Sequence, residues 1–124
     1  MITGEEVYVL LKSVEHLRFY KQGGFEMQWY CAFTWYPHTD RQQVAQRILQ
    51  QHEAGAHSNR HIRGWYNLAG GGSGFLIVET NTPQELTAML QPYMDLMSWD
   101  VRAIYPLEYD EQIQEMRKVA RTAP

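Results

Sequence analysis

Glu79 is the residue whose sequence neighbours best suit acid–base chemistry. It alternates with Phe75 and Ile77 in an apolar stretch, and alternate residues of a β-strand share one face of a sheet. Apolar neighbours desolvate a carboxylate and favour its neutral form, which suits a general acid or base. The alternative is an ion pair with Arg63 or Arg102 that fixes the sheet or a subunit interface, which is the more frequent role of such a carboxylate.

The same alternation places polar and aromatic side chains of a preceding strand beside Glu79. Arg63, Trp65 and Asn67 alternate there, and an arginine in this position suits bidentate binding of a substrate carboxylate. In the structural alternative, the arginines pair with carboxylates of the protein itself. We predict one ligand-binding surface made of Arg63, Trp65, Asn67, Phe75, Ile77, Glu79 and Arg102.

Three histidines raise the question of a metal site. His52, His57 and His61 fall within ten residues and have Glu53 nearby, and such side chains bind zinc or copper. They are expected at a helix end, in a loop and at a strand start, so their spacing does not bring them together and we predict no metal site. His52 joins Glu79 as a candidate catalytic residue, although a histidine at a helix end is more often packed or exposed.

Residues 70–74 form a glycine-rich run, Gly-Gly-Gly-Ser-Gly. Phosphate-binding loops lead from a strand into a helix and carry Lys-Ser/Thr or a GxGxxG register, whereas here a second strand follows. The run therefore predicts a β-hairpin. No Ser-His-Asp or Cys-His arrangement can be assembled from the spacing, and we predict no cofactor.

The composition limits the classes of partner. The chain has 124 residues, a net charge of −3 and 44% hydrophobic residues, which describes one domain with a modest core. The excess of acidic residues argues against binding to nucleic acid. Cys31 is the single cysteine, so one chain cannot form a disulfide within itself. No stretch approaches the ~18 apolar residues of a membrane span, and we expect a cytoplasmic protein without one.

Hydrophobic periodicity divides the chain into an N-terminal helical extension, residues 1–26, and a folded domain, residues 27–124. The extension carries an apolar stripe that suits docking on a protein partner. In the domain, Asp40 and the pair Thr82-Pro83 mark two helix starts, because capping side chains and proline favour first turns. Strands are predicted at residues 28–36, 62–69, 75–80 and 99–107, and a C-terminal helix follows from Asp110.

This order, β-α-β-β-α-β, predicts an α+β protein of the ferredoxin-like type, a four-stranded antiparallel sheet with both helices on one face. To the helix side we assign Trp29, Cys31, Phe33, Trp35, Ile62, Gly64, Tyr66, Leu68, Leu76, Val78, Val101 and Ala103. The other side then holds Tyr30, Thr34, Arg63, Trp65, Asn67, Phe75, Ile77, Glu79, Asp100, Arg102 and Ile104. This second face is too apolar to stay in water, so we expect a homodimer packed sheet against sheet.

Several segments, taken together, resemble a known family. They are Arg63-Gly64-Trp65-Tyr66, Ala69-Gly70-Gly71-Gly72, Gly74-Phe75-Leu76-Ile77-Val78-Glu79-Thr80 and Trp99-Asp100-Val101. Over about residues 27–113 the chain resembles the bacterial domain-of-unknown-function 3303 family of the dimeric α/β-barrel superfamily. The resemblance implies two ferredoxin-like subunits whose sheets form a shared barrel. Within that superfamily, the set Trp65, Asn67 and His52 resembles the Asn-Trp-His sets of cofactor-independent and haem-degrading monooxygenases, at a different spacing.

Two functions from different classes fit these observations. The first is an uncharacterised small homodimeric binding or accessory protein that uses the open sheet face as an interface and small-ligand pocket. The alternative is a cofactor-independent monooxygenase or isomerase that acts on a small molecule inside the barrel. The sequence leaves open whether the protein is an enzyme.

Overall fold

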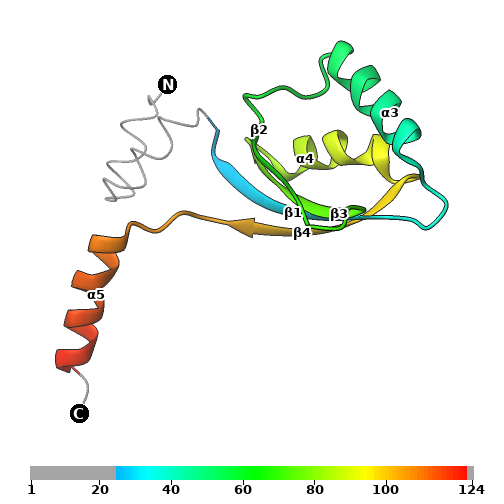
Figure 1. Ribbon diagram of the computed structural model, residues 1–124. Coiled ribbons are helices and arrows are strands. Elements are labelled where there is room, and N and C mark those ends of the chain that lie inside the picture. Colours follow the sequence, from blue (N-terminus) through cyan, green and yellow to red (C-terminus); the bar gives the residue numbers. More distant parts are fainter. Residues whose placement is uncertain (1–24, 123–124) are drawn as a thin grey trace, which may run out of the picture.

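The computed structural model describes residues 25–122 and shows an α+β fold (Figure 1). The predicted N-terminal extension, up to residue 24, lies outside the described residues. The described elements are β1 (Met27–Trp35), α3 (Arg41–Glu53), β2 (Ile62–Asn67), β3 (Ser73–Thr80), α4 (Pro83–Leu90), the short 3-10 helix η1 (Gln91–Tyr93), β4 (Met97–Ile104) and α5 (Tyr109–Thr122).

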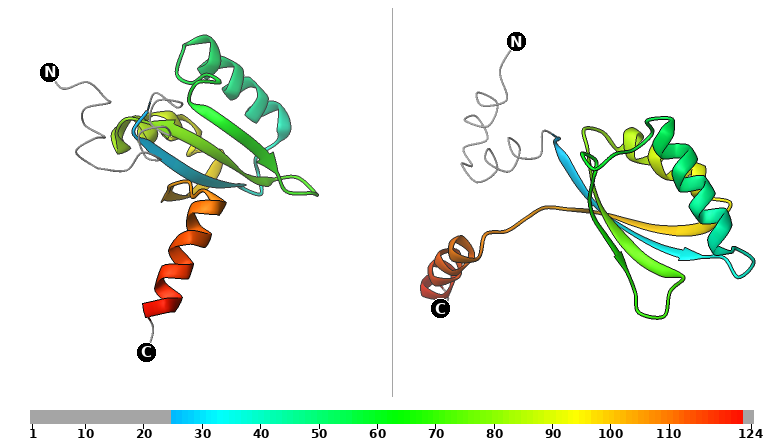
Figure 2. Two further views of the ribbon diagram at one scale, coloured as in Figure 1. Left: turned by 90° about the vertical axis from the view of Figure 1, so that its left-hand side faces the viewer. Right: turned by 45° about the horizontal axis from the view of Figure 1, so that its top comes forward.

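The four strands form one antiparallel sheet in the order β2-β3-β1-β4. This order, with the β-α-β-β-α-β succession, confirms the predicted ferredoxin-like fold. α3 and α4 lie on the same side of the sheet, and none of the described helices covers the opposite side (Figures 1 and 2). We call that opposite side the open face.

Side-chain caps explain where the two covering helices begin. The carboxylate of Asp40 accepts a hydrogen bond from the backbone N–H of Gln43 (2.8 Å), and the Gln43 side chain accepts one from the N–H of Asp40 (2.9 Å). Before α4, the hydroxyl of Thr82 accepts from the N–H of Glu85 (3.1 Å), and Pro83 is the first helical residue. These bonds satisfy N–H groups that have no partner within the helix, as the sequence predicts.

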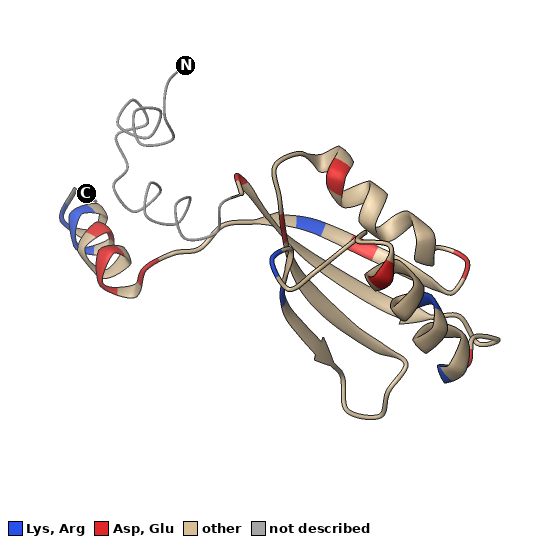
Figure 3. Cartoon of the chain, turned by 90° about the horizontal axis from the view of Figure 1, so that it is seen from above, with Lys and Arg blue, Asp and Glu red and all other residues tan. Residues whose placement is uncertain are grey.

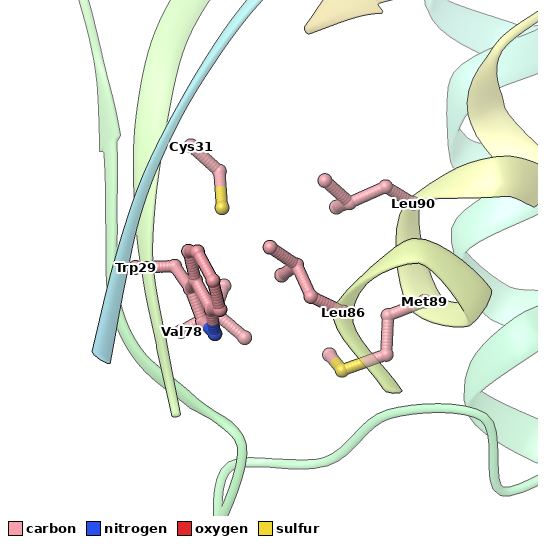
Figure 4. Close-up of a cluster of buried hydrophobic side chains, with 6 residues drawn as sticks. All are labelled: Trp29, Cys31, Val78, Leu86, Met89 and Leu90. Carbon is pink, nitrogen blue, oxygen red and sulfur yellow. The ribbon is translucent and has the colours of Figure 1, made fainter. Parts of the chain in front are cut away.

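One of the two buried clusters of the core lies between the sheet and α4, and the other includes Val44 of α3 and Tyr93 of η1. Figure 4 shows the strand residues facing the helix residues in one buried cluster, which consists of Trp29, Cys31, Val78, Leu86, Met89 and Leu90. The indole N–H of Trp29 donates to the hydroxyl of Thr80 (2.9 Å), so this polar group is satisfied inside the core. Burial raises the pKa of the Cys31 thiol to about 12, so Cys31 is a packing residue and not a nucleophile.

The pairing of β1 with β3 and β4 confirms the predicted faces of these three strands. Cys31 lies opposite Leu76 on one neighbour and Val101 on the other, so these side chains share the helix-covered side. Tyr30 lies opposite Ile77, and both are on the open face.

The predicted face was right for Ile62 and wrong for the residues of β2 that follow it. Gly64 and Tyr66 lie on the open face, while Trp65 and Asn67 lie on the helix-covered side. The cause is a β-bulge that follows Ile62, where the register with β3 shifts by one residue. Because side chains alternate along a strand, a shift of one residue moves every later side chain to the other face.

The C-terminal part differs from the prediction in its boundaries. β4 ends at Ile104, before Pro106, and α5 begins at Tyr109 and lies apart from the sheet (Figure 1). Over residues 25–122, no helix has the length and hydropathy required to cross a bilayer. Figure 3 shows that the acidic and the basic positions are both scattered along the described helices, strands and connections, without a long run of basic positions.

Candidate functional site

The most prominent hollow of the described residues is a cavity of about 680 Å³ on the helix-covered side of the sheet. It lies between α3, the β2–β3 hairpin and the end of α4. Its apolar walls include Phe33, Trp35, Val44, Ile48, Ile62, Trp65, Leu76, Leu90, Met97 and Trp99. Its polar lining includes Arg41, His57, Asn67 and Tyr93. The site therefore combines a large apolar surface with a few polar groups, which is typical of small-molecule pockets.

The position of α3 explains why this space is open. Arg47 on α3 forms two hydrogen bonds with the carboxylate of Asp95 (2.7 and 3.0 Å) and a further one with the carbonyl of Pro92. This hydrogen bonding holds the pKa of Asp95 below its usual value. The contacts tie α3 to the turn between η1 and β4, while the edge strand β2 is less covered and Trp65 is 56% exposed. The cavity consequently opens along β2.

His57 and Tyr93 form a hydrogen-bonded pair in the cavity wall. His57 Nε2 lies 2.9 Å from the Tyr93 hydroxyl. Desolvation lowers the pKa of His57, and the neighbouring His52 and His61 lower it further. Desolvation raises the pKa of Tyr93 to about 12. Both groups are therefore neutral at pH 7, and the pair can exchange a hydrogen bond with a polar group of a ligand.

Arg41, at the N-terminal end of α3, is the one arginine among the described residues that line the cavity. Arg41 is the first residue of the helix and is exposed at the rim. Among residues 25–122 it has no acidic partner within ion-pair distance. Trp99 adds a second polar group to the lining, because its buried Nε1–H has no hydrogen-bond acceptor within residues 25–122. Such unpaired donors are uncommon in folded proteins.

The structure divides the predicted ligand-binding set between two sides of the sheet. Trp65 and Asn67 line the cavity. Phe75, Ile77, Glu79 and Arg102 belong to the open face, where Phe75 packs between Tyr30 and Tyr66 at ring-centroid distances of 5.1 and 4.8 Å. Arg63 lies exposed at the bulge of β2. The prediction of one shared surface is therefore wrong, because the bulge separates its members.

Glu79 is buried, but it does not form the predicted ion pair with Arg63 or Arg102. Its Oε2 accepts a hydrogen bond from the side-chain amide of Gln28 (3.1 Å), and its buried Oε1 has no hydrogen-bond partner among the described residues. Arg102 instead lies 3.6 Å from Asp100 in an exposed pair. Glu79 does not line the cavity.

His52 and His61 lie outside the cavity lining. His52 is exposed in the last turn of α3, with its ring centroid 6.5 Å from that of His57. His61 packs on Phe25, with ring centroids 5.1 Å apart. In the described part of the chain, no three His, Cys, Asp or Glu side chains converge in a group that could hold a metal ion.

Sequence reasoning missed Arg41, His57 and Tyr93 as site residues. His57 lies in a connection without periodicity, and Tyr93 is a buried aromatic residue of η1 whose sequence context suits core packing as well as a site. One signal was available, because Val44 and Ile48 give α3 an apolar face that must lie over the sheet. That face could have directed attention to the space between α3 and the hairpin.

Comparison with family models gives a match over residues 27–120 to the family described as domain of unknown function DUF3303. The chain belongs to this family. No curated protein sequence matches the chain at a significant level. The match to DUF3303 covers the whole sheet and both covering helices, so the cavity is built entirely from residues inside the family domain. The description of this family names no activity.

Proposed function

We propose that this DUF3303 protein binds a small, largely apolar molecule in the cavity between α3 and the β2–β3 hairpin. The cavity itself carries the proposal. Its volume of about 680 Å³ lies within the range of roughly 300–1,000 Å³ that ligand pockets occupy. Its walls are mainly aliphatic and aromatic, and a few polar groups at its margins would orient a ligand.

We further propose that the protein acts as a homodimer through the open face, as a binding or accessory protein in the cytoplasm. Tyr30, Phe75 and Tyr66 pack together on this face, and no described helix covers them. An uncovered sheet face that carries packed aromatic rings favours association. The buried, reduced Cys31 suits a reducing compartment.

A cofactor-independent monooxygenase or isomerase remains the second proposal, and the His57–Tyr93 pair is the observation that favours it. An uncharged imidazole hydrogen-bonded to a phenol in an apolar cavity can accept a proton from a bound substrate. Its test is exchange of the methyl-ketone hydrogens of 2-acetylnaphthalene in D2O, followed by NMR. Exchange that depends on the protein and is lost in His57→Asn would support catalysis, while exchange at the buffer rate would contradict it.

The binding proposal is tested with N-phenyl-1-naphthylamine, a neutral apolar dye whose fluorescence rises on leaving water. Ile48→Trp would fill the cavity, because Ile48 lines it. Leu49→Trp is the matched control, since Leu49 is on the same helix but is 57% exposed. We expect the dye to bind the wild type and Leu49→Trp equally. Ile48→Trp should weaken binding about tenfold or more, a loss of about 1.4 kcal/mol.

Two results would contradict the binding proposal. The first is the absence of saturable dye binding to the folded wild type. The second is unchanged dye affinity in a folded Ile48→Trp variant, because the dye would then bind elsewhere. Circular dichroism spectra of both variants establish that each one is folded.

A further inference from the structure

The proposed binding site has one strongly polar feature that an apolar ligand alone does not explain, namely Arg41. Arg41 lines the cavity and is exposed to solvent, and its side chain has no acidic partner within ion-pair distance among residues 25–122. The neighbouring carboxylate of Asp40 caps α3 by accepting from the backbone N–H of Gln43. Arg47, by contrast, is held by Asp95 and the carbonyl of Pro92. Arg41 is therefore the charged side chain of this cavity that is free to meet a ligand.

The position of Arg41 in its helix is also electrostatically unfavourable. It is the first residue of α3, whose first turn contains no acidic residue, so the N-cap Asp40 is the carboxylate that faces both the positive helix end and the charge of Arg41. The N-terminal end of a helix carries a partial positive charge, so a cation there is repelled and an anion is attracted. An anionic group bound at the rim would offset the repulsion and would pair with the guanidinium.

The walls beside Arg41 favour a flat molecule. Trp35, Trp65, Phe33 and Trp99 contribute aromatic rings to the same cavity. Aromatic rings pack on one another in stacked or edge-to-face arrangements and gain more than their buried area alone provides. One guanidinium matches one carboxylate in charge and in its paired hydrogen-bond geometry.

We propose that the ligand of this cavity is a planar aromatic carboxylate, whose rings lie among the tryptophans and whose carboxylate is bound by Arg41 at the rim. This inference rests on the proposed function, because it specifies the ligand of the same site. In this proposal, Arg41 recognises the charge of the ligand and the apolar walls recognise its flat shape. His57 lies beyond the other end of α3, so it is not required to bind the carboxylate.

The experiment compares 2-naphthoate with 2-naphthamide, which has nearly the same shape and no charge. Calorimetry is carried out with the full-length chain at low ionic strength. We expect 2-naphthoate to bind about tenfold more tightly than the amide. Arg41→Gln should lower the affinity for the acid to about that of the amide and so remove this preference. Arg63→Gln is the matched control, because Arg63 is also exposed but does not line the cavity, and it should retain the preference.

The possible results separate this inference from the proposed function. Equal affinity of the wild type for acid and amide would overturn the carboxylate assignment while the cavity remained a binding site. A preference for the acid that persists in Arg41→Gln would overturn the role of Arg41. If both naphthalene compounds and the neutral dye fail to bind, the proposed function itself is wrong.

Discussion

At the scale of single residues, the sequence predicts correctly that Glu79 is buried but predicts the wrong partner for its carboxylate. Alternation with apolar neighbours predicted a desolvated carboxylate, and its exposed fraction is 5%. The two arginines that were expected to pair with it lie elsewhere. The carboxylate has one hydrogen-bond donor, Gln28, for two oxygens. A buried charge with an unpaired oxygen lowers stability.

We therefore expect Glu79→Gln to stabilise the protein by about 1 kcal/mol, because the variant replaces a buried, incompletely hydrogen-bonded carboxylate and keeps the side-chain shape. Urea unfolding at pH 7 measures the change. Glu53→Gln, at an exposed position of α3, is the control and should stay within about 0.5 kcal/mol of the wild type. A loss of stability in Glu79→Gln would show that the carboxylate has a strong partner in solution.

The lowered pKa of His57 predicts how the free energy of unfolding depends on pH. Its pKa is lowered from 6.5 in the folded protein by desolvation, then by His52 and His61. Since the unfolded chain then binds the proton more readily, His57 stabilises the fold above pH 6.5, and this contribution is lost as the pH falls through the folded pKa. The free energy of unfolding should decrease between pH 7.5 and pH 5.5. The pKa of Asp95 lies below 3.8, so the Arg47–Asp95 pair does not titrate in this window.

The variant His57→Gln tests this assignment, because it removes the titrating ring and retains a polar side chain. The pH dependence of its unfolding free energy should be clearly weaker than that of the wild type. His38→Gln, at an exposed position after β1, should keep the dependence of the wild type. Equal dependence in wild type and His57→Gln would exclude His57 as the source.

At the scale of elements, the β2–β3 hairpin combines the tightest packing with the largest error of prediction. Gly74 on β3 lies so close to its neighbours that an added Cβ would be 2.1 Å from the carbonyl oxygen of Tyr66 and 2.7 Å from the ring of Phe33. In contrast, a Cβ at Gly71 would contact nothing, although its φ of +83° is unfavourable for other residues.

Gly74→Ala should therefore destabilise the protein by about 3 kcal/mol through a clash with backbone that cannot move away. Gly71→Ala should cost about 1 kcal/mol, since only the strain of its backbone conformation applies. Thermal unfolding of both variants measures the difference. Similar losses in the two variants would mean that the hairpin relaxes around Gly74 and that its packing against Phe33 is loose.

The elements of the fold could be predicted because their signals are local. Asp40 with Gln43, and Thr82 with Pro83, specify two helix starts through contacts only a few residues long. Alternation in β1 and β3 specified their faces for the same reason. These local signals, with the order of elements, were sufficient for the ferredoxin-like topology.

The site could not be predicted, because it depends on a bulge and on long-range contacts. The register shift after Ile62 arises from the pairing of β2 with β3, and no residue type within β2 indicates it. The His57–Tyr93 hydrogen bond joins positions 36 residues apart. The position of α3 depends on Arg47 and Asp95, which are 48 residues apart. A single sequence carries no direct record of such pairs.

At the scale of the whole molecule, the two sides of the sheet differ in how their apolar groups are covered. The helix-covered side contains the core and the cavity. On the open face, Tyr30, Phe75 and Tyr66 form an aromatic cluster, and Tyr66 is 54% exposed. Asp100 and Arg102 provide both charge signs on the neighbouring β4. A two-fold axis places such a face against itself, so apolar groups can meet apolar groups and each charge can meet its opposite.

We expect light scattering at micromolar concentration to give a mass twice the 14.6 kDa of one chain. Phe75→Glu should shift the mass to that of one chain, because it places a carboxylate at the centre of the aromatic cluster on both copies. Leu49→Glu introduces the same charge on the outer side of α3, where Leu49 is 57% exposed, and should remain dimeric. A wild type that is folded and monomeric at this concentration would overturn the sheet-to-sheet dimer, and the binding cavity, which lies within one chain, would then function in a monomer.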